Sequence, residues 1–230
     1  MANYLIIGSS SGIGKEISSL LNEKKDVTVI GAGRENRQGE SNFHVLDVTK
    51  PETFPELDCD LHGLVYCPGT ITLKSFRTLK EDDFMKDFEI NLLGAFRILQ
   101  KYLPLLQRTN QASVVLFSTV AVGLGLPYHA SISAAKGAIE GLTRTLAAEW
   151  SPKIRVNAIA PSLTDTKLSE KLLDTDTKRK SAEERHPLKK IGQARDIASL
   201  ACWLLTDSSQ FVTGQVWKMD GGLGSVKITP

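Results

Sequence analysis

Cysteine is scarce in this sequence, because Cys59, Cys67 and Cys202 are the only three in 230 residues. Three is an odd number, and their spacing does not fit a metal site. Each lies in or beside an apolar segment, where free cysteines are commonly buried. We therefore expect buried, reduced thiols rather than a disulfide framework, and a reducing cytoplasm as the compartment.

Long apolar runs and an excess of one charge are missing as well. No stretch reaches the ~18 consecutive apolar residues of a membrane-spanning helix, and the amino terminus enters a predicted strand without an export leader. The 28 basic residues are scattered among 26 acidic ones, which leaves a net charge of +2. These absences predict a soluble cytoplasmic protein that needs neither a membrane nor a nucleic-acid partner.

The sequence does contain a regular alternation of apolar strand patterns and amphipathic helix patterns. This alternation predicts an α/β fold: a doubly wound parallel sheet with helices on both faces, the Rossmann fold. The length suits one domain over residues 1–230, with a charged substrate flap at about 163–190. The predicted strands are 4–7, 27–30, 43–46, 61–66, 113–117, 155–160 and 215–219, and the predicted helices 13–21, 81–107, 131–150 and 194–205.

A glycine-rich turn joins the first predicted strand to the first predicted helix. It has the sequence Gly8-Ser-Ser-Ser-Gly12-Ile-Gly14. Free N–H groups at the start of a helix and the helix dipole favour a phosphate there, and glycine allows the close approach. An ordinary loop is the alternative, but the position between strand and helix favours a nucleotide site. We therefore expect the cofactor to contact Gly8, Ser10, Ser11, Gly12, Ile13 and Gly14.

The second predicted strand ends at Gly33 and is followed by Arg34 and Arg37. In a doubly wound fold an acidic residue near this point binds the 2′-hydroxyl of NAD, whereas arginine suits the 2′-phosphate of NADP. The sequence thus favours NADP(H), with NAD(H) possible, although both arginines could be ordinary solvated charges. Asp47 and Val48 end the third predicted strand and would face the adenine, unless Asp47 is only a turn residue.

Further polar and small residues lie where the cleft should be. The fourth predicted strand is followed by Cys67, Pro68 and Gly69, and small residues at this strand end suit a cofactor cleft, so we expect all three to contact the cofactor. Asn91 interrupts the long helical pattern 81–107 between apolar neighbours; it could face solvent, but we expect an inward, functional amide. Lys136 lies beside the apolar stripe of 131–150, so it must extend to solvent or find a partner.

Together these motifs resemble the short-chain dehydrogenase/reductase family, classical type, over nearly the whole chain. The resemblance implies hydride exchange between a nicotinamide cofactor and a carbonyl or alcohol. It also implies a tyrosine acid or base, a serine that orients the substrate oxygen, a lysine on the ribose and an asparagine in the proton relay. The motifs are Gly8 to Gly14, Asp47-Val48, Asn91-Leu-Leu-Gly94, Lys136 to Thr143, Arg155 to Pro161, Val212-Thr-Gly-Gln-Val216 and Asp220-Gly-Gly222.

The active site departs from the family pattern. The family tyrosine stands four residues before the lysine, and that position here is Ile132, which cannot move a proton. The serine position holds Thr119, with Ser118 adjacent, and a threonine supplies a similar hydroxyl. The usual glycine after Pro161 is Ser162. The positions that match the family are Asn91, Lys136, Thr164 and Thr166, and with Pro161 the last two are expected to contact the cofactor.

Tyr128 and His129 lie just before the helix that carries Lys136, and either could replace the missing proton donor. Histidine exchanges protons near neutral pH. The alternative is that Tyr128 packs in its loop and His129 faces solvent. We expect an NADP-dependent oxidoreductase acting on a small carbonyl or alcohol. The alternative function is an NADP(H)-binding sensor or assembly protein with little catalysis. The resemblance also implies a homodimer or homotetramer. No metal is expected, because the cysteine spacing does not fit a metal site.

Overall fold

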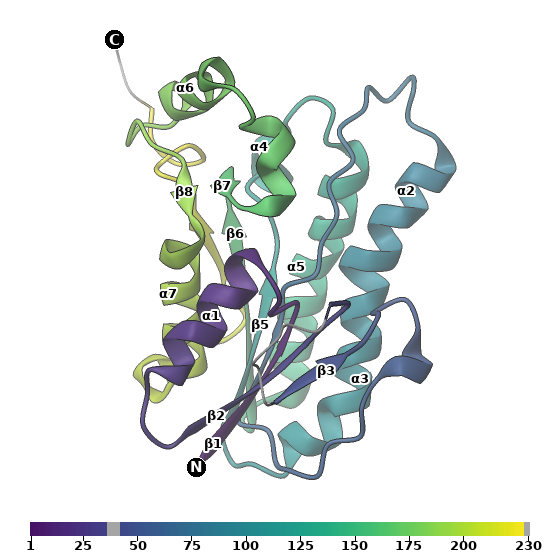
Figure 1. Cartoon of the computed structure of the whole chain (residues 1–230), viewed down its shortest axis with the longest axis vertical. Helices are drawn as coiled ribbons and strands as arrows, with labels where there is room; N and C mark the ends of the chain where they lie inside the picture. Colours follow the sequence, from purple (N-terminus) through teal and green to yellow (C-terminus); the bar gives the residue numbers. More distant parts are fainter. Residues whose placement is uncertain (36–41, 228–230) are drawn as a thin grey trace.

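A seven-stranded parallel sheet forms the centre of the computed structural model, which describes residues 1–35 and 42–227 (Figure 1). The strand order is β3-β2-β1-β4-β5-β6-β9, so the chain winds outward from β1 in both directions. The predicted doubly wound sheet is thereby confirmed. The strands are β1 (Ala2–Ile7), β2 (Val27–Gly33), β3 (Phe43–Val45), β4 (Gly63–Tyr66), β5 (Ala112–Phe117), β6 (Ile154–Pro161) and β9 (Val216–Met219).

Helices cover both faces of the sheet. On one face α1 (Gly12–Asn22) packs against α7 (Ala194–Leu205), and on the other lie α3 (Gly94–Gln107) and α5 (Ala130–Trp150), as Figure 1 shows. Successive β1 side chains enter opposite cores, with Leu5 on the α3 face and Ile6 on the α1 face. Burial on both faces explains why the strands are continuous apolar runs.

The long helix predicted over 81–107 consists of three pieces. α2 (Glu81–Phe88) leads through a π-helical turn, η2 (Glu89–Leu93), into α3 without a break in the chain direction. A π turn shifts the face that a helix presents, and such turns are frequent at functional sites. Here the buried face carries Asp87 and Asn91, both 0 % exposed. The apolar stripe that the sequence predicts is not buried along its whole length, because Phe96 is 47 % exposed.

The segment predicted as a flap is folded. β7 (Thr164–Asp165) pairs with β8 (Gly192–Gln193), and between them lie η3 (Lys167–Leu172) and α6 (Asp176–Arg185). Leu173, Ala182 and Ile191 form a small core beneath this segment. Movement of the flap stays a prediction. The remaining short elements are η1 (Pro51–Thr53), α4 (Ala121–Leu124) and η4 (Asp207–Ser209).

The three cysteines are free thiols, as predicted. Cys202 is buried, as expected, but Cys59 and Cys67 are only half-buried. The expectation of full burial is therefore wrong for these two. Within the described residues no helix has the length and apolarity needed to cross a membrane.

Candidate active site

A cavity of about 580 Å³ lies at the carboxyl edge of the sheet, where β1, β2 and β4 end. Because all strands are parallel, their carboxyl ends meet at this one edge. We refer to it as the cofactor cavity. Three of the predicted cofactor contacts are not in its wall: Lys136 lies on α5, Pro161 ends β6, and Thr164 is buried in β7. The predicted contacts that do line it are Gly8, Ser10, Ser11, Gly12, Ile13, Gly14, Arg34, Asp47, Val48, Cys67, Pro68, Gly69 and Thr166.

The glycine turn has the geometry that a nucleotide phosphate requires. Gly8 and Gly12 have φ angles of +85° and +54°, which favour glycine. A Cβ on Gly14 would lie 2.3 Å from the carbonyl oxygen of Gly8, so the helix meets the strand too closely for any side chain. The Ser11 side chain makes no capping hydrogen bond to α1. The first N–H groups of α1 therefore face the cavity as anion donors, and the site fits a dinucleotide.

The adenosine end of the cavity contains both basic and acidic groups. Arg34 and the adjacent Glu35 line it, and Glu35 is an acid that the sequence reasoning overlooked. Arg37 lies outside the described residues. Asp47 accepts hydrogen bonds from the backbone N–H of Thr49 at 2.9 Å and from its hydroxyl at 2.8 Å. These bonds lower the pKa of the Asp47 carboxyl. Asp47 is therefore a turn residue and also part of the cavity wall.

Asn91 and Lys136 lie directly behind the cavity wall. A Cβ on Gly69 would be 3.1 Å from Oδ1 of Asn91 and 3.9 Å from Nζ of Lys136, so both polar groups flank this glycine. The Asn91 amide donates to the backbone oxygen of Asp87 at 2.8 Å and to the Thr70 hydroxyl at 3.0 Å. Its Oδ1 is buried and accepts no hydrogen bond from any described residue. Asn91 is thus inward, as predicted.

Lys136 is only 8 % exposed on α5. Burial lowers the pKa of its ammonium to about 8, while Cys67 and Asp87 act in the opposite direction. An amine with this pKa exchanges protons near physiological pH and can also donate hydrogen bonds to sugar hydroxyls. Ile132, one turn earlier on α5, is 4 % exposed and apolar at the position of the family tyrosine.

The two hydroxyls at the end of β5 have different partners. Ser118 is buried and donates to the Glu140 carboxylate on α5 at 2.8 Å. Thr119 is half-buried, and its hydroxyl oxygen accepts from the backbone N–H of Ala121 at 3.3 Å. The Thr119 hydroxyl donates to no residue of the described chain, whereas the hydrogen of Ser118 is engaged.

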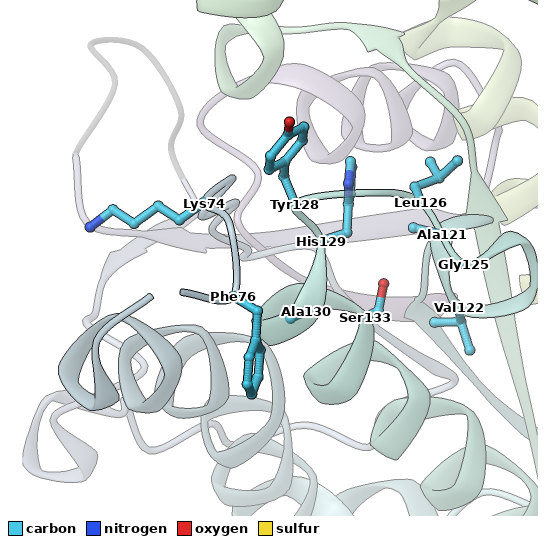
Figure 2. A pocket seen from close by; sticks show the side chains of 10 residues that line it. All are labelled: Lys74, Phe76, Ala121, Val122, Gly125, Leu126, Tyr128, His129, Ala130 and Ser133. Carbon is cyan, nitrogen blue, oxygen red and sulfur yellow. The ribbon is translucent and has the colours of Figure 1, made fainter. Parts of the chain in front are cut away.

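Tyr128 and His129 line a second cavity, of about 370 Å³, between α4 and the start of α5. Figure 2 shows their rings extending to the same side of this cavity, away from the ring of Phe76. Tyr128 is 62 % exposed, and Nδ1 of His129 lies 2.7 Å from the Pro127 carbonyl oxygen. The second cavity shares no lining residue with the cofactor cavity. The structure therefore does not bring these two candidate donors together with the predicted cofactor residues.

Besides Glu35, two further residues of the site were missed in the sequence. Thr70 lines the cofactor cavity and bonds Asn91, and Asp87 is a fully buried carboxylate one helical turn before Asn91. The signal for Asp87 in the sequence was its position one helical turn before an asparagine that is predicted to face inward. The apolar residues around it hid this signal, because they suggest an apolar stripe on another face of the helix. The π turn changes which face is buried.

Comparison with known proteins agrees with this geometry. A family profile described as Enoyl-(Acyl carrier protein) reductase matches residues 7–224. The chain is 32 % identical over 239 residues to the 3-oxoacyl-[acyl-carrier-protein] reductase FabG of Thermotoga maritima, covering 95 % of this chain and 96 % of that protein. A tropinone reductase homologue of Arabidopsis thaliana is 39 % identical over 168 residues, which are 71 % of this chain and 63 % of the relative.

Solved structures give the same result. A short chain dehydrogenase family protein from Francisella tularensis superposes with a TM-score of 0.91 at 28 % identity, covering 98 % of this chain and 100 % of the other. ElxO with NADP bound superposes with a TM-score of 0.85 at 27 % identity, covering 98 % and 99 %. Fold, glycine turn, lysine and asparagine coincide with a family match over most of the length. The chain therefore belongs to the short-chain dehydrogenase/reductase family.

Proposed function

We propose that this protein is an NADP-dependent oxidoreductase that transfers a hydride between nicotinamide and a small carbonyl or alcohol substrate. The observation that carries the proposal is the continuity of the cofactor cavity. Its wall runs from the free N–H groups of α1 to Gly69, behind which Lys136 and Asn91 lie. Relatives named as 3-oxoacyl and tropinone reductases support a carbonyl as the substrate class.

Each part of the cavity has a role in this proposal. The glycine turn binds the pyrophosphate, Arg34 pairs with the 2′-phosphate, and Lys136 donates to the nicotinamide ribose. Thr119 donates a hydrogen bond to the substrate oxygen and orients it. The nicotinamide, when bound, supplies the hydride chemistry itself. NADP-bound ElxO, similar over nearly the whole chain, supports the choice of NADP over NAD.

The proton needs a donor other than Ile132, and we propose Tyr128 or His129, acting from the second cavity. General acid catalysis typically contributes ~10²–10⁴-fold, so a poorly placed donor gives a slow enzyme rather than an inactive one. We expect Tyr128→Phe or His129→Asn to lower kcat by about 10-fold or more with an unchanged Kd for NADPH. If neither substitution lowers kcat, this donor assignment is wrong.

A second candidate function is a weakly catalytic NADP(H)-binding sensor or assembly protein. The buried Ile132, at 4 % exposure, favours it, because no titratable group occupies the tyrosine position. Turnover separates the two functions. NADPH oxidation would be followed by absorbance with 3-oxoacyl thioesters and cyclic ketones. Substrate-dependent oxidation supports the enzyme, whereas NADPH binding without oxidation on any carbonyl supports the sensor.

We also propose a cytoplasmic homodimer or homotetramer. Met85 on α2 and Phe96 on α3 are 51 % and 47 % exposed, and such apolar side chains on neighbouring helical segments suit an interface between copies. Light scattering coupled to gel filtration measures the mass directly. A monomer of 25.1 kDa at micromolar concentration would contradict this part of the proposal.

A further inference from the structure

Asp87 on α2 is a buried carboxylate with no cationic partner in direct contact. It is 0 % exposed, and no lysine, arginine or histidine of the described residues lies within salt-bridge distance. Burial of an unpaired charge is costly, and such groups are retained mostly where they have a function. Asp220, the other buried aspartate of the described chain, instead accepts backbone N–H groups in a turn. Asp87 therefore requires a separate explanation.

Three hydroxyl groups from two other segments donate to this carboxylate. Oδ1 accepts from Thr70 at 2.7 Å and from Thr72 at 3.3 Å, both in the loop after β4. Oδ2 accepts from Ser131 in the first turn of α5 at 2.6 Å. Hydrogen bonds that hydroxyls donate to a carboxylate are charge-assisted and strong. The three hydroxyls thus satisfy both oxygens of Asp87 and hold its side chain in place.

The network continues from Asp87 to the cavity wall. Because the Thr70 hydroxyl hydrogen points to Asp87, its oxygen is left to accept from the Asn91 amide nitrogen at 3.0 Å. This contact, together with the hydrogen bond from the same nitrogen to the Asp87 backbone oxygen at 2.8 Å, fixes which end of the amide faces Thr70. The opposite end, Oδ1, then faces the Gly69 wall, where Nζ of Lys136 lies. Asp87 therefore contributes twice, through Thr70 and through its own backbone oxygen, to presenting Oδ1 of Asn91 to the lysine side of the site.

Charge provides a second link between Asp87 and Lys136. Two groups outside α5 act on this ammonium, Cys67 after β4 and Asp87 on α2. Burial raises the pKa of the Cys67 thiol, so Cys67 is neutral at physiological pH. On α5 itself, the Glu140 carboxylate accepts from Ser118 and pairs with Arg144 at 3.4 Å. Asp87 remains as the uncompensated negative charge that favours the protonated lysine.

We propose that Asp87 is a positioning residue: through Thr70 it helps to hold the Asn91 amide with Oδ1 toward Gly69 and Lys136, and its carboxylate is the buried negative charge that acts on the Lys136 ammonium. The inference rests on the proposed function only in taking Lys136 as the cofactor-binding lysine. The charge and the hydrogen bonds act in the protein without cofactor. They can therefore be tested independently of catalysis.

The test compares Asp87→Asn with Asp82→Asn, an exposed aspartate on the same helix. The pH titration of Lys136 would be followed by NMR on protein labelled at the lysine side chains, with Lys136→Arg identifying the signal. In the wild type we expect a midpoint near the pKa of about 8 that burial gives this lysine. Loss of the Asp87 charge favours the neutral amine, so we expect a midpoint at least about one pH unit lower in Asp87→Asn. Asp82→Asn should leave it unchanged.

The charge role is overturned if the Lys136 titration midpoint is the same in Asp87→Asn and in the wild type. An isosteric substitution with only structural effects would not move this midpoint.

Thr70→Val tests the orientation of the Asn91 amide, and this test remains available even if Asp87→Asn fails to fold. We expect the Asn91 side-chain amide hydrogens to exchange with water at least about 10-fold faster in Thr70→Val. An unchanged exchange rate overturns the positioning role. Neither readout needs NADPH, so failure of the proposed function would be seen separately as absent binding or turnover.

Discussion

The two cavities at this end of the molecule have walls of different kinds. The cofactor cavity has five glycines in its wall, and at Gly8, Gly12 and Gly14 the backbone itself allows close approach. The second cavity has one glycine, and its wall includes the side chains of Tyr128 and His129. A glycine turn between a strand and a helix follows from the fold, whereas the chemistry of a side chain depends on each residue. The difference explains how the cofactor apparatus matches the family while the proton donor does not.

The largest expected effect concerns the glycine turn. In Gly14→Ala the new Cβ would lie 2.3 Å from the Gly8 carbonyl oxygen, so helix and strand must separate. We expect no measurable NADPH binding and a loss of about 1–3 kcal/mol in the free energy of unfolding. Nucleotide fluorescence and urea denaturation measure the two quantities.

A matched control is Gly141→Ala, in the exposed middle of α5, where a Cβ meets nothing within 4 Å. It should raise the free energy of unfolding by roughly 0.5–1 kcal/mol and leave NADPH binding unchanged. Equal NADPH affinity in Gly14→Ala and Gly141→Ala would show that the glycine turn does not bind the cofactor.

The next effect concerns the position where the proton donor is missing. Ile132→Tyr places a phenol one turn from Lys136, and we expect kcat on an accepted carbonyl to rise by about 10²-fold. Ile132→Phe is the control, because it has nearly the same size without the hydroxyl. A similar rise in both variants would assign the gain to packing rather than to proton transfer. The comparison requires the initial rates of NADPH oxidation.

The sequence predicts those parts of the site that are built from consecutive residues, and it does not predict those that depend on contacts between distant segments. The strands and the glycine turn are local, since β1, the turn and α1 are consecutive in the chain. The environment of Asp87 is not local: Ser131 is 44 residues away and Thr70 is 17 residues away. The preference of Ser118 for Glu140 rather than the cavity likewise depends on how α5 packs on β5.

The helical pattern 81–107 illustrates the same limit. Its existence was predicted correctly, but the π turn changes which residues face the sheet, so Asn91 and Asp87 are buried and Phe96 is exposed. Regular periodicity cannot show such a turn. Glu35 directly follows Arg34, and only the folded chain shows that both residues line the cofactor cavity.

Arg34 provides a smaller effect at the adenosine end. We expect Arg34→Ala to weaken NADPH binding by about 10- to 100-fold, the value of one to two charge-assisted hydrogen bonds, and to leave NADH binding unchanged. Glu35→Ala is the natural companion and should not weaken NADPH binding. Titration of each variant with both nucleotides tests this. Equal weakening for NADH would contradict pairing of Arg34 with the 2′-phosphate.

The smallest effect is the pH dependence of cofactor binding. Because burial lowers the pKa of Lys136 to about 8, its ammonium is present below that pH and lost above it. We expect the affinity for NADPH to fall several-fold as the pH rises from 7 to 9, and to lose this dependence in Lys136→Met. The same lysine destabilises the folded protein below pH 8, and this penalty is relieved as the pH rises further. A flat profile in the wild type would remove Lys136 from the cofactor site.

The central claim is that the cavity at the glycine turn binds NADPH although the family tyrosine is replaced by Ile132. Isothermal titration calorimetry of the wild-type protein with NADPH, and separately with NADH, tests it most directly. The account predicts one NADPH bound per chain, with a lower Kd than for NADH. Absence of binding for both nucleotides would contradict the assignment of the glycine turn and, with it, the proposed oxidoreductase.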